Sequence, residues 1–324
     1  MRARPFSAAP LLLIAACLLA VSCSSAPKKA ETVTEARNRA AEATDVGNAY
    51  YRQGRYDLAL RFFSQALDDN TSVDNVEGII QSSNSIGKVY MAIGSLDAAE
   101  EIFSSALTRS AGGSVELFFV SSNNLGELYL QKGEPAKALA TFEQVLSPAS
   151  GAPSGASSGA RAGGLSDLQR AVLYHNLGAA HKNLGDFAKA REDLEKSLAI
   201  NIAHKLAEET AADYYMLASV DSKQGNLESA MKNAELALAI DKKIENSVGI
   251  AMDLSALGII SLKRKDMAAA YDYFQRSYLV STTLSMRSDM RKALIELIAV
   301  ADALGRTAEA ENDRRALMEL ESSP

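Results

Sequence analysis

The sequence repeats one short pattern at intervals of about 40 positions. In the most regular units, a small residue is followed by tyrosine three positions later, glycine at seven, alanine at twelve and phenylalanine at sixteen. The small-residue position falls at 47, 87, 126, 178, 218 and 258, and a degenerate copy falls at 298. The intervals are 40, 39, 52, 40, 40 and 40. Such a period indicates a stack of similar units, because one unit cannot bury its apolar face alone.

Residues 177–198 show the predicted structure of one unit. Gly185 should end a first helix, because glycine readily adopts the left-handed conformation common at helix C-termini. Asp186 can cap a second helix. Apolar residues then recur at three- and four-residue spacing, at Phe187, Ala190, Leu194 and Leu198. The unit is therefore predicted to be an antiparallel helix pair, in which Gly178 lets the second helix cross closely.

Composition supports an all-α fold. Apolar residues make up 47% of the chain, but aromatic residues only 6%, and there is no tryptophan. This alanine- and leucine-rich balance suits packed helices, and strand patterns are nearly absent. The formal net charge of −6 argues against nucleic acid as the main partner. The predicted fold is a solenoid of about six helical hairpins, with a degenerate C-terminal hairpin that caps the stack.

The pattern resembles the tetratricopeptide repeat (TPR). It shares the small residue, aromatic, turn glycine, alanine and aromatic at fixed offsets, although the usual unit has about 34 residues. The longer period is similar to that of kinesin light chains and LGN-type regulators, most closely over residues 237–260. The resemblance implies a right-handed superhelix whose first helices line a concave groove. It also implies binding of a protein or peptide partner, and little more about function.

The N-terminus is expected to be a targeting segment. Arg2 and Arg4 precede an apolar run over residues 11–21, which is too short to be a permanent membrane span. Residues 1–22 followed by Cys23 resemble a bacterial lipoprotein signal, in which this cysteine would carry the lipid. Cys17 is a weaker match, and an ordinary secretory signal is the alternative. The resemblance implies membrane attachment through Cys23 and a location in the bacterial cell envelope. Ser24 favours the outer membrane, facing the periplasm.

The remaining chain divides at one segment of low complexity. Residues 23–30 form a tether, 31–146 hold three repeats, and 165–324 hold three more with the capping repeat. Residues 147–164 contain mainly Gly, Ala, Ser and Pro, so they cannot build a core. They are interpreted as a flexible loop, with a hinge as the alternative. Pro135 is predicted at the first position of a helix, and Ser166 with Gln169 is predicted to form a capping box.

No pattern in the chain points to catalysis. His175, His181 and His204 are the only histidines, and the first two are turned apart on their helix by a six-residue spacing. His181 takes the slot of a packing tyrosine, and Asp193 is expected on a solvated face. We therefore expect no catalytic residue, no metal site and no cofactor.

The predicted binding surface is the inner wall. An amide side chain can both donate and accept, so asparagines there could bond a partner's backbone, as the resemblance implies. The alternative is that they bond within the array. The expected function is that of a scaffold that binds another envelope protein. The alternative functions are assembly of a pilus, secretion or outer-membrane complex, ligand binding as an accessory to a transporter, and regulation of a peptidoglycan enzyme. The candidate groove residues are Asn48, Tyr51, Arg52, Asn84, Lys88, Asn123, Asn124, His175, Asn176, Lys182 and Tyr215.

Overall fold

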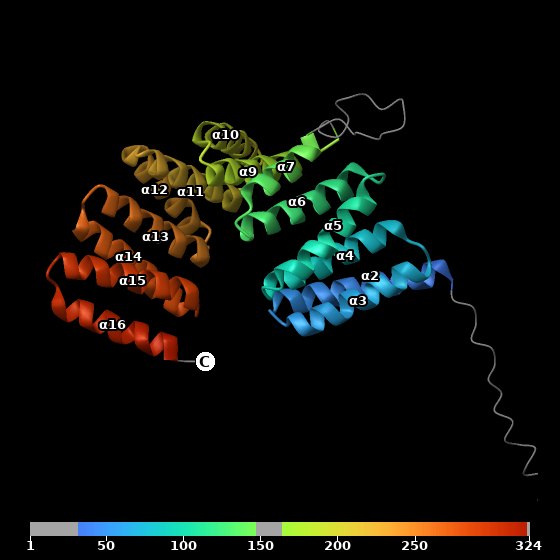
Figure 1. Ribbon diagram of the computed structural model, residues 1–324, viewed down its shortest axis with the longest axis horizontal. Coiled ribbons are helices and arrows are strands. Elements are labelled where there is room, and N and C mark those ends of the chain that lie inside the picture. Colours follow the sequence, from blue (N-terminus) through green and yellow to red (C-terminus); the bar gives the residue numbers. More distant parts are fainter. Residues whose placement is uncertain (1–31, 147–163, 323–324) are drawn as a thin grey trace, which may run out of the picture.

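A computed structural model describes residues 32–146 and 164–322. Over these residues the chain forms helices and no strand, and the helices follow one another as seven antiparallel pairs (Figure 1). The pairs are α2 (Val33–Arg52) with α3 (Tyr56–Ser72), α4 (Val76–Ala92) with α5 (Leu96–Ser110), α6 (Val115–Gln131) with α7 (Pro135–Leu146), α9 (Asp167–Leu184) with α10 (Phe187–Ala203), α11 (Ala207–Gln224) with α12 (Leu227–Lys243), α13 (Ser247–Lys263) with α14 (Met267–Thr283), and α15 (Arg287–Ala303) with α16 (Thr307–Ser322). The predicted all-α solenoid is confirmed.

The ends of the helices follow from local sequence. Gly185 has a φ of 83° and ends α9, and the Asp186 side chain accepts the backbone N–H of Lys189 at the start of α10. Pro135 begins α7, as predicted from its missing N–H. Ser166 and Gln169 form the predicted capping box before α9. The turn between the two helices of a pair is thus specified by a few residues.

The core lies where paired helices cross. The alanine twelve positions after the small residue is fully buried in four units, at Ala59, Ala99, Ala190 and Ala230. A Cβ added to Gly178 would lie 2.6 Å from Cγ of Leu194, so only glycine allows this approach. Each pair therefore closes on small residues, and large apolar side chains fill the space between successive pairs.

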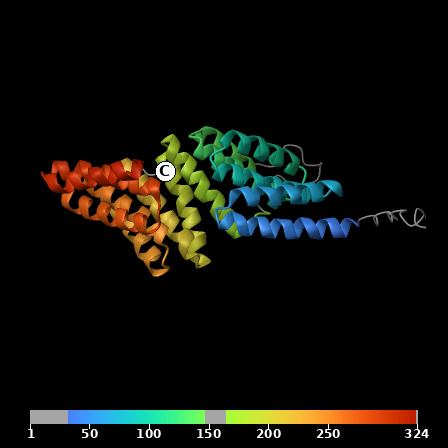
Figure 2. The same ribbon diagram turned by 90° about the horizontal axis from the view of Figure 1, so that it is seen from below.

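The stack bends into an arc. In Figure 1 the first and last pairs face each other across an opening, and Figure 2 shows them at opposite ends of the long axis. From α2 to α13, each first helix packs against the first helix of the next pair, whereas successive second helices in the described chain do not pack in this way. The first helices therefore form the inner wall, as expected.

The last pair closes the C-terminal end of the stack. On α16 only Ala310 is buried, and Arg314 and Arg315 are exposed. This agrees with the predicted polar capping helix.

Several sequence predictions lie outside the described residues. They are the leader, Cys23, the tether over residues 23–30, and nearly all of the loop over residues 147–164. Within the described ranges, no helix has both the length and the apolar character required to cross a bilayer.

Candidate binding groove

The inner wall contains three hollows, each formed mainly by neighbouring first helices. The α9–α11 hollow is about 300 Å³, the α11–α13 hollow about 220 Å³ and the α4–α6 hollow about 250 Å³. Small-molecule pockets usually have volumes of about 300–1,000 Å³, so the α9–α11 hollow reaches the lower end of that range and the other two are smaller. The three hollows lie in the groove that the repeat pattern predicted as the binding surface.

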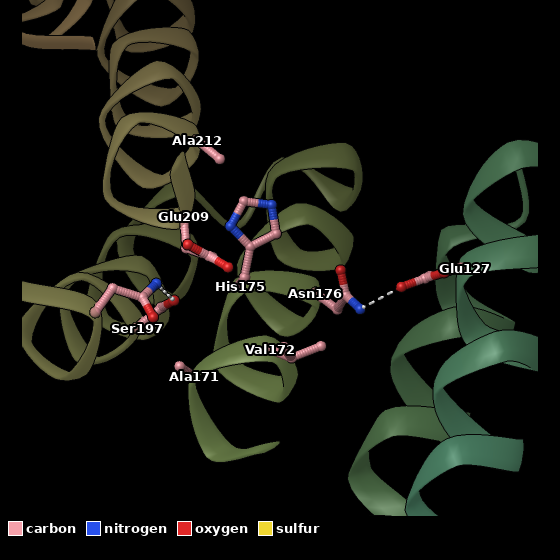
Figure 3. Close-up of a pocket in the computed structure, with 9 residues that line it drawn as sticks. Glu127, Ala171, Val172, His175, Asn176, Ser197, Glu209 and Ala212 are labelled. Atoms are coloured by element: carbon pink, nitrogen blue, oxygen red, sulfur yellow. Dashed lines mark hydrogen bonds between the residues drawn. The ribbon is translucent and has the colours of Figure 1, made fainter. Parts of the chain in front are cut away.

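The α9–α11 hollow brings together side chains from four helices (Figure 3). His175 on α9 lies at its centre, and Nδ1 of this ring is 2.7 Å from Oδ1 of Asp213 on α11. Asn201 on α10 donates to the other oxygen of Asp213 at 2.8 Å. Asp213 is fully buried, and these two contacts satisfy its carboxyl oxygens and fix the orientation of the His175 ring. The hollow is lined by Glu127, Ala171, Val172, His175, Asn176, Ser197, Asn201, Glu209 and Ala212.

Glu127 forms the opposite side of this hollow. Its Oε1 accepts hydrogen bonds from Asn123 at 2.8 Å and from Asn176 at 3.1 Å. Asn176 also donates to Oδ1 of Asn123 at 2.8 Å. These bonds join α6 to α9 across the segment of residues 147–164, and they hold the Glu127 carboxylate in place. The repeats on the two sides of that segment are therefore in direct contact through the groove.

Asn84 and Asn124, like Asn123 and Asn176, form hydrogen bonds within the array. Asn84 donates to Oγ of Ser121 at 2.9 Å, and Asn124 donates to Oδ1 of Asn84 at 3.0 Å. Both side chains are buried, which agrees with the alternative that the asparagines bond within the array, and their binding of a partner stays a prediction. Breaking such bonds would leave buried polar groups unpaired, which is costly. Their main effect here is to join α4 to α6.

The α11–α13 hollow has a basic lining. Lys223 and Lys263 line it together with Tyr215, and Nζ of Lys263 donates to the carbonyl and the hydroxyl of Ser222. Burial raises the pKa of Tyr215. Lys182, one helix away, contacts the Met216 sulfur, and burial followed by the charge of Lys223 lowers the pKa of Lys182. The α9–α11 hollow is therefore lined by the acidic residues Glu127 and Glu209, and the adjacent α11–α13 hollow by the basic residues Lys223 and Lys263.

The remaining candidate residues lie toward the N-terminal end. Asn84 and Lys88 line the α4–α6 hollow, and Lys88 is exposed. Asn48, Tyr51 and Arg52 lie on α2, away from the hollows described above, and Tyr51 packs edge-on against Tyr56. Binding by these residues stays a prediction.

One sequence expectation was wrong. Asp193 is buried rather than solvated. Its burial is tolerated because its Oδ2 lies 2.9 Å from Nδ1 of His181, which is also buried. The two residues lie twelve positions apart on paired helices, and each satisfies the other's polar atoms. In the described part of the chain, no group of His, Cys, Asp and Glu is arranged to hold a metal ion.

Sequence reasoning missed the buried acids of the groove. Asp213 and Asp253 occupy the same position in successive first helices, 40 residues apart, and both are buried. Their partners Asn201 and Asp241 are also 40 residues apart on the preceding second helices. The signal that could have revealed them is the recurrence of aspartate at the same position of successive units, at Asp213 and Asp253.

Comparison with known proteins agrees with this geometry. Two family models, both described as tetratricopeptide repeat, match residues 39–112 and 169–243 and residues 84–153, which together exceed half of the chain. This chain belongs to the tetratricopeptide repeat family. Among curated proteins none matches it significantly.

Solved structures share the TPR fold at low sequence identity. The apo quorum sensor NprR from B. thuringiensis is 16% identical with a TM-score of 0.67, over 90% of this chain and 78% of that one. A Rap protein complexed with competence and sporulation factor is 16% identical with a TM-score of 0.61, over 87% and 74%. PilW, a type IV pilus biogenesis factor, is 19% identical with a TM-score of 0.56, over 79% and 98%. At these identities the likeness establishes the fold only.

Proposed function

We propose that this TPR protein is a non-catalytic, lipid-anchored scaffold of a bacterial cell envelope, which binds a segment of another envelope protein in its groove. The observation that carries the proposal is the continuous inner wall with three hollows, formed mainly by first helices from five successive pairs, α4, α6, α9, α11 and α13. The lipid anchor and the periplasmic location rest on the resemblance of residues 1–23 to a lipoprotein signal.

Exposed apolar side chains in the groove support binding of a polypeptide. Val172 lines the α9–α11 hollow and is 41% exposed, while Ile259 lines the α11–α13 hollow and is 42% exposed. Apolar side chains beside polar hydrogen-bonding groups are the usual composition of a peptide-binding groove. The fold is also that of a Rap protein whose structure contains competence and sporulation factor.

The groove assignment is tested by crosslinked capture from the native envelope. The full-length wild-type chain should capture a specific envelope protein, and the double variant Val172→Glu with Ile259→Glu should lose it, because two buried charges would enter the interface. Leu279→Glu is the matched control, since this residue is 58% exposed on the outer helix α14. Equal capture by all three proteins would refute the groove as the binding site.

A second candidate function is assembly of an envelope machine. PilW, a type IV pilus biogenesis factor, has a fold similar to that of this chain over 98% of its own length. Identification of the captured protein separates the two functions. A pilus, secretin or outer-membrane subunit would favour the assembly factor, and a partner outside such machines would favour the general scaffold.

A further inference from the structure

The α9–α11 hollow is acidic on two sides. Glu127 of α6 lines one side, and Glu209 of α11 lies beside the His175 ring on the other (Figure 3). The buried carboxylate of Asp213 lies behind the ring. Of the lining residues in the described chain, none is lysine or arginine. The hollow therefore has a negative potential that a cationic group would complement.

Two of the three acidic groups, Glu127 and Asp213, are positioned before any ligand binds. Two amide donors hold the Glu127 carboxylate, and Asp213 fixes the plane of His175. Side chains that are already ordered lose little entropy when a ligand arrives, so preorganisation increases affinity. The unused acceptor positions of the Glu127 carboxylate can then receive a donor from a ligand.

Part of the wall is apolar. Ala171, Val172 and Ala212 also line the hollow, and their side chains contain only methyl and methine groups. Lysine and arginine combine an aliphatic stem with a charged end, and they commonly bury the stem along apolar surface. A guanidinium has five donors and can also stack on a ring such as His175. The hollow thus matches a basic side chain in both its charge and its apolar part.

We propose that the α9–α11 hollow is a specificity subsite for a basic side chain, arginine or lysine, of the bound polypeptide segment. This inference rests on the proposed function, since it assumes that a segment lies in the groove. The adjacent α11–α13 hollow carries Lys223 and Lys263, so it would repel the same side chain. The opposite charges would set the register of the segment along the groove.

The test is selection of peptides from a displayed library of random dodecapeptides by the immobilised full-length chain in detergent. Peptides selected by the wild type should be enriched in arginine or lysine at one position. The double variant Glu127→Gln with Glu209→Gln should bind a selected peptide about tenfold more weakly, because two charge-assisted hydrogen bonds become neutral. Glutamine keeps the acceptor that Asn123 and Asn176 require.

Two further variants make the test specific. Glu208→Gln removes a neighbouring exposed charge that does not line the hollow, and it should leave binding within about twofold of wild type. Glu209→Lys places a cation at the hollow, so the library should then yield peptides in which an acidic residue replaces the basic one. Circular dichroism and thermal unfolding of each variant should match wild type.

The outcomes separate the subsite from the groove. Peptides that require Val172 but show no basic preference, or that bind the double glutamine variant equally well, would overturn the subsite and leave the groove intact. If the wild type selects no peptide and envelope capture is insensitive to Val172→Glu with Ile259→Glu, the groove function fails, and the subsite fails with it. A basic preference that reverses in Glu209→Lys would establish the proposal.

Discussion

Packing between paired helices depends on complementary sizes at two positions. In four units a glycine at the small-residue position faces a phenylalanine sixteen residues later, for example Gly87 against Phe103. In the fourth unit the glycine faces Leu194, and in the fifth Ala218 replaces the glycine while the later residue shrinks to Ala234, both fully buried. Interiors are close-packed, so a methyl group gained on one helix requires volume lost on the other.

This size relation predicts the effect of one methyl group. In Gly87→Ala the new Cβ would lie 2.4 Å from the ring of Phe103, so the pair must separate, and the free energy of unfolding should fall by about 1–3 kcal/mol. Gly112→Ala is the control, because no atom lies within 4 Å of its added Cβ. Urea unfolding monitored by circular dichroism measures both. Equal stability of the two variants would contradict the packing model.

A second residue-level feature is the pair of acids between the fifth and sixth units. Asp241 and Asp253 are both buried, whereas the equivalent junction one unit earlier pairs Asn201 with Asp213. Burial, followed by the charge and hydrogen bond of Asp241, raises the pKa of Asp253 to about 8. Burial also raises the pKa of Asp241. At this junction the folded chain therefore holds a proton that the unfolded chain releases near pH 4.

The bound proton makes stability depend on pH. Between about pH 4 and pH 8 the folded state binds more protons than the unfolded state, so stability should fall as the pH rises, by up to about 1.4 kcal/mol per pH unit for one proton. The substitution Asp241→Asn gives this junction the same residue types as the Asn201–Asp213 junction one unit earlier. The new amide can donate a hydrogen bond to the ionised carboxylate of Asp253. Its melting temperature should exceed that of wild type at pH 9 and differ less at pH 5. A parallel pH dependence of the two proteins would refute this account.

At the scale of the helix, each second helix carries a fully buried alanine at the same repeat position. Ala230 on α12 is fully buried in a cluster with Ala218, Leu254 and Leu257. The same position in other units holds Ala59, Ala99 and Ala190. The distance between packed helices depends on the side chains at their contact, so these alanines, together with the glycines of the first helices, allow a close approach.

Enlarging this alanine should destabilise the array. Ala230→Leu is expected to lower the free energy of unfolding by about 1–3 kcal/mol through overpacking, and Ala59→Leu, Ala99→Leu and Ala190→Leu should behave alike. Ala239→Leu, on the exposed face of the same helix, is the matched control. Thermal unfolding compares the variants. Unchanged melting in all four buried positions would refute the repeat register.

For the whole molecule, the arc has one continuous inner wall because the two halves of the array meet there. The bonds from Asn176 to Asn123 and Glu127 join α9 to α6, although residues 147–163 separate these helices in sequence. A partner segment can therefore contact both halves at once. The α9–α11 hollow spans this junction, so it combines residues from both sides.

Attachment to a membrane is predicted at the same scale. Cys23→Ser should move the protein from the membrane fraction to the soluble periplasmic fraction, because the proposed lipid supplies the membrane affinity. Immunoblots of cell fractions measure this change, and Cys17→Ser, which alters the weaker lipobox match, is the control. A Cys23→Ser protein that stays in the membrane fraction to the same extent as wild type would exclude Cys23 as the lipidation site.

The sequence by itself determined the helical hairpins and their stacking. Short-range spacing specifies each pair, as Gly185, Asp186 and Ala190 show, and each unit contacts mainly its neighbours, so the repeated pattern already contains the fold. It also predicted the inner wall as the surface of the candidate site.

Only the tertiary structure decided which polar side chains of that wall form hydrogen bonds with other residues of the array. Asn84 bonds Asn124 across 40 residues, and His175 bonds Asp213 across 38. Whether such side chains meet depends on the approach of neighbouring helices to within a few ångströms, and a hydrogen bond tolerates little error in distance. Residue spacing within one helix carries no information about that approach.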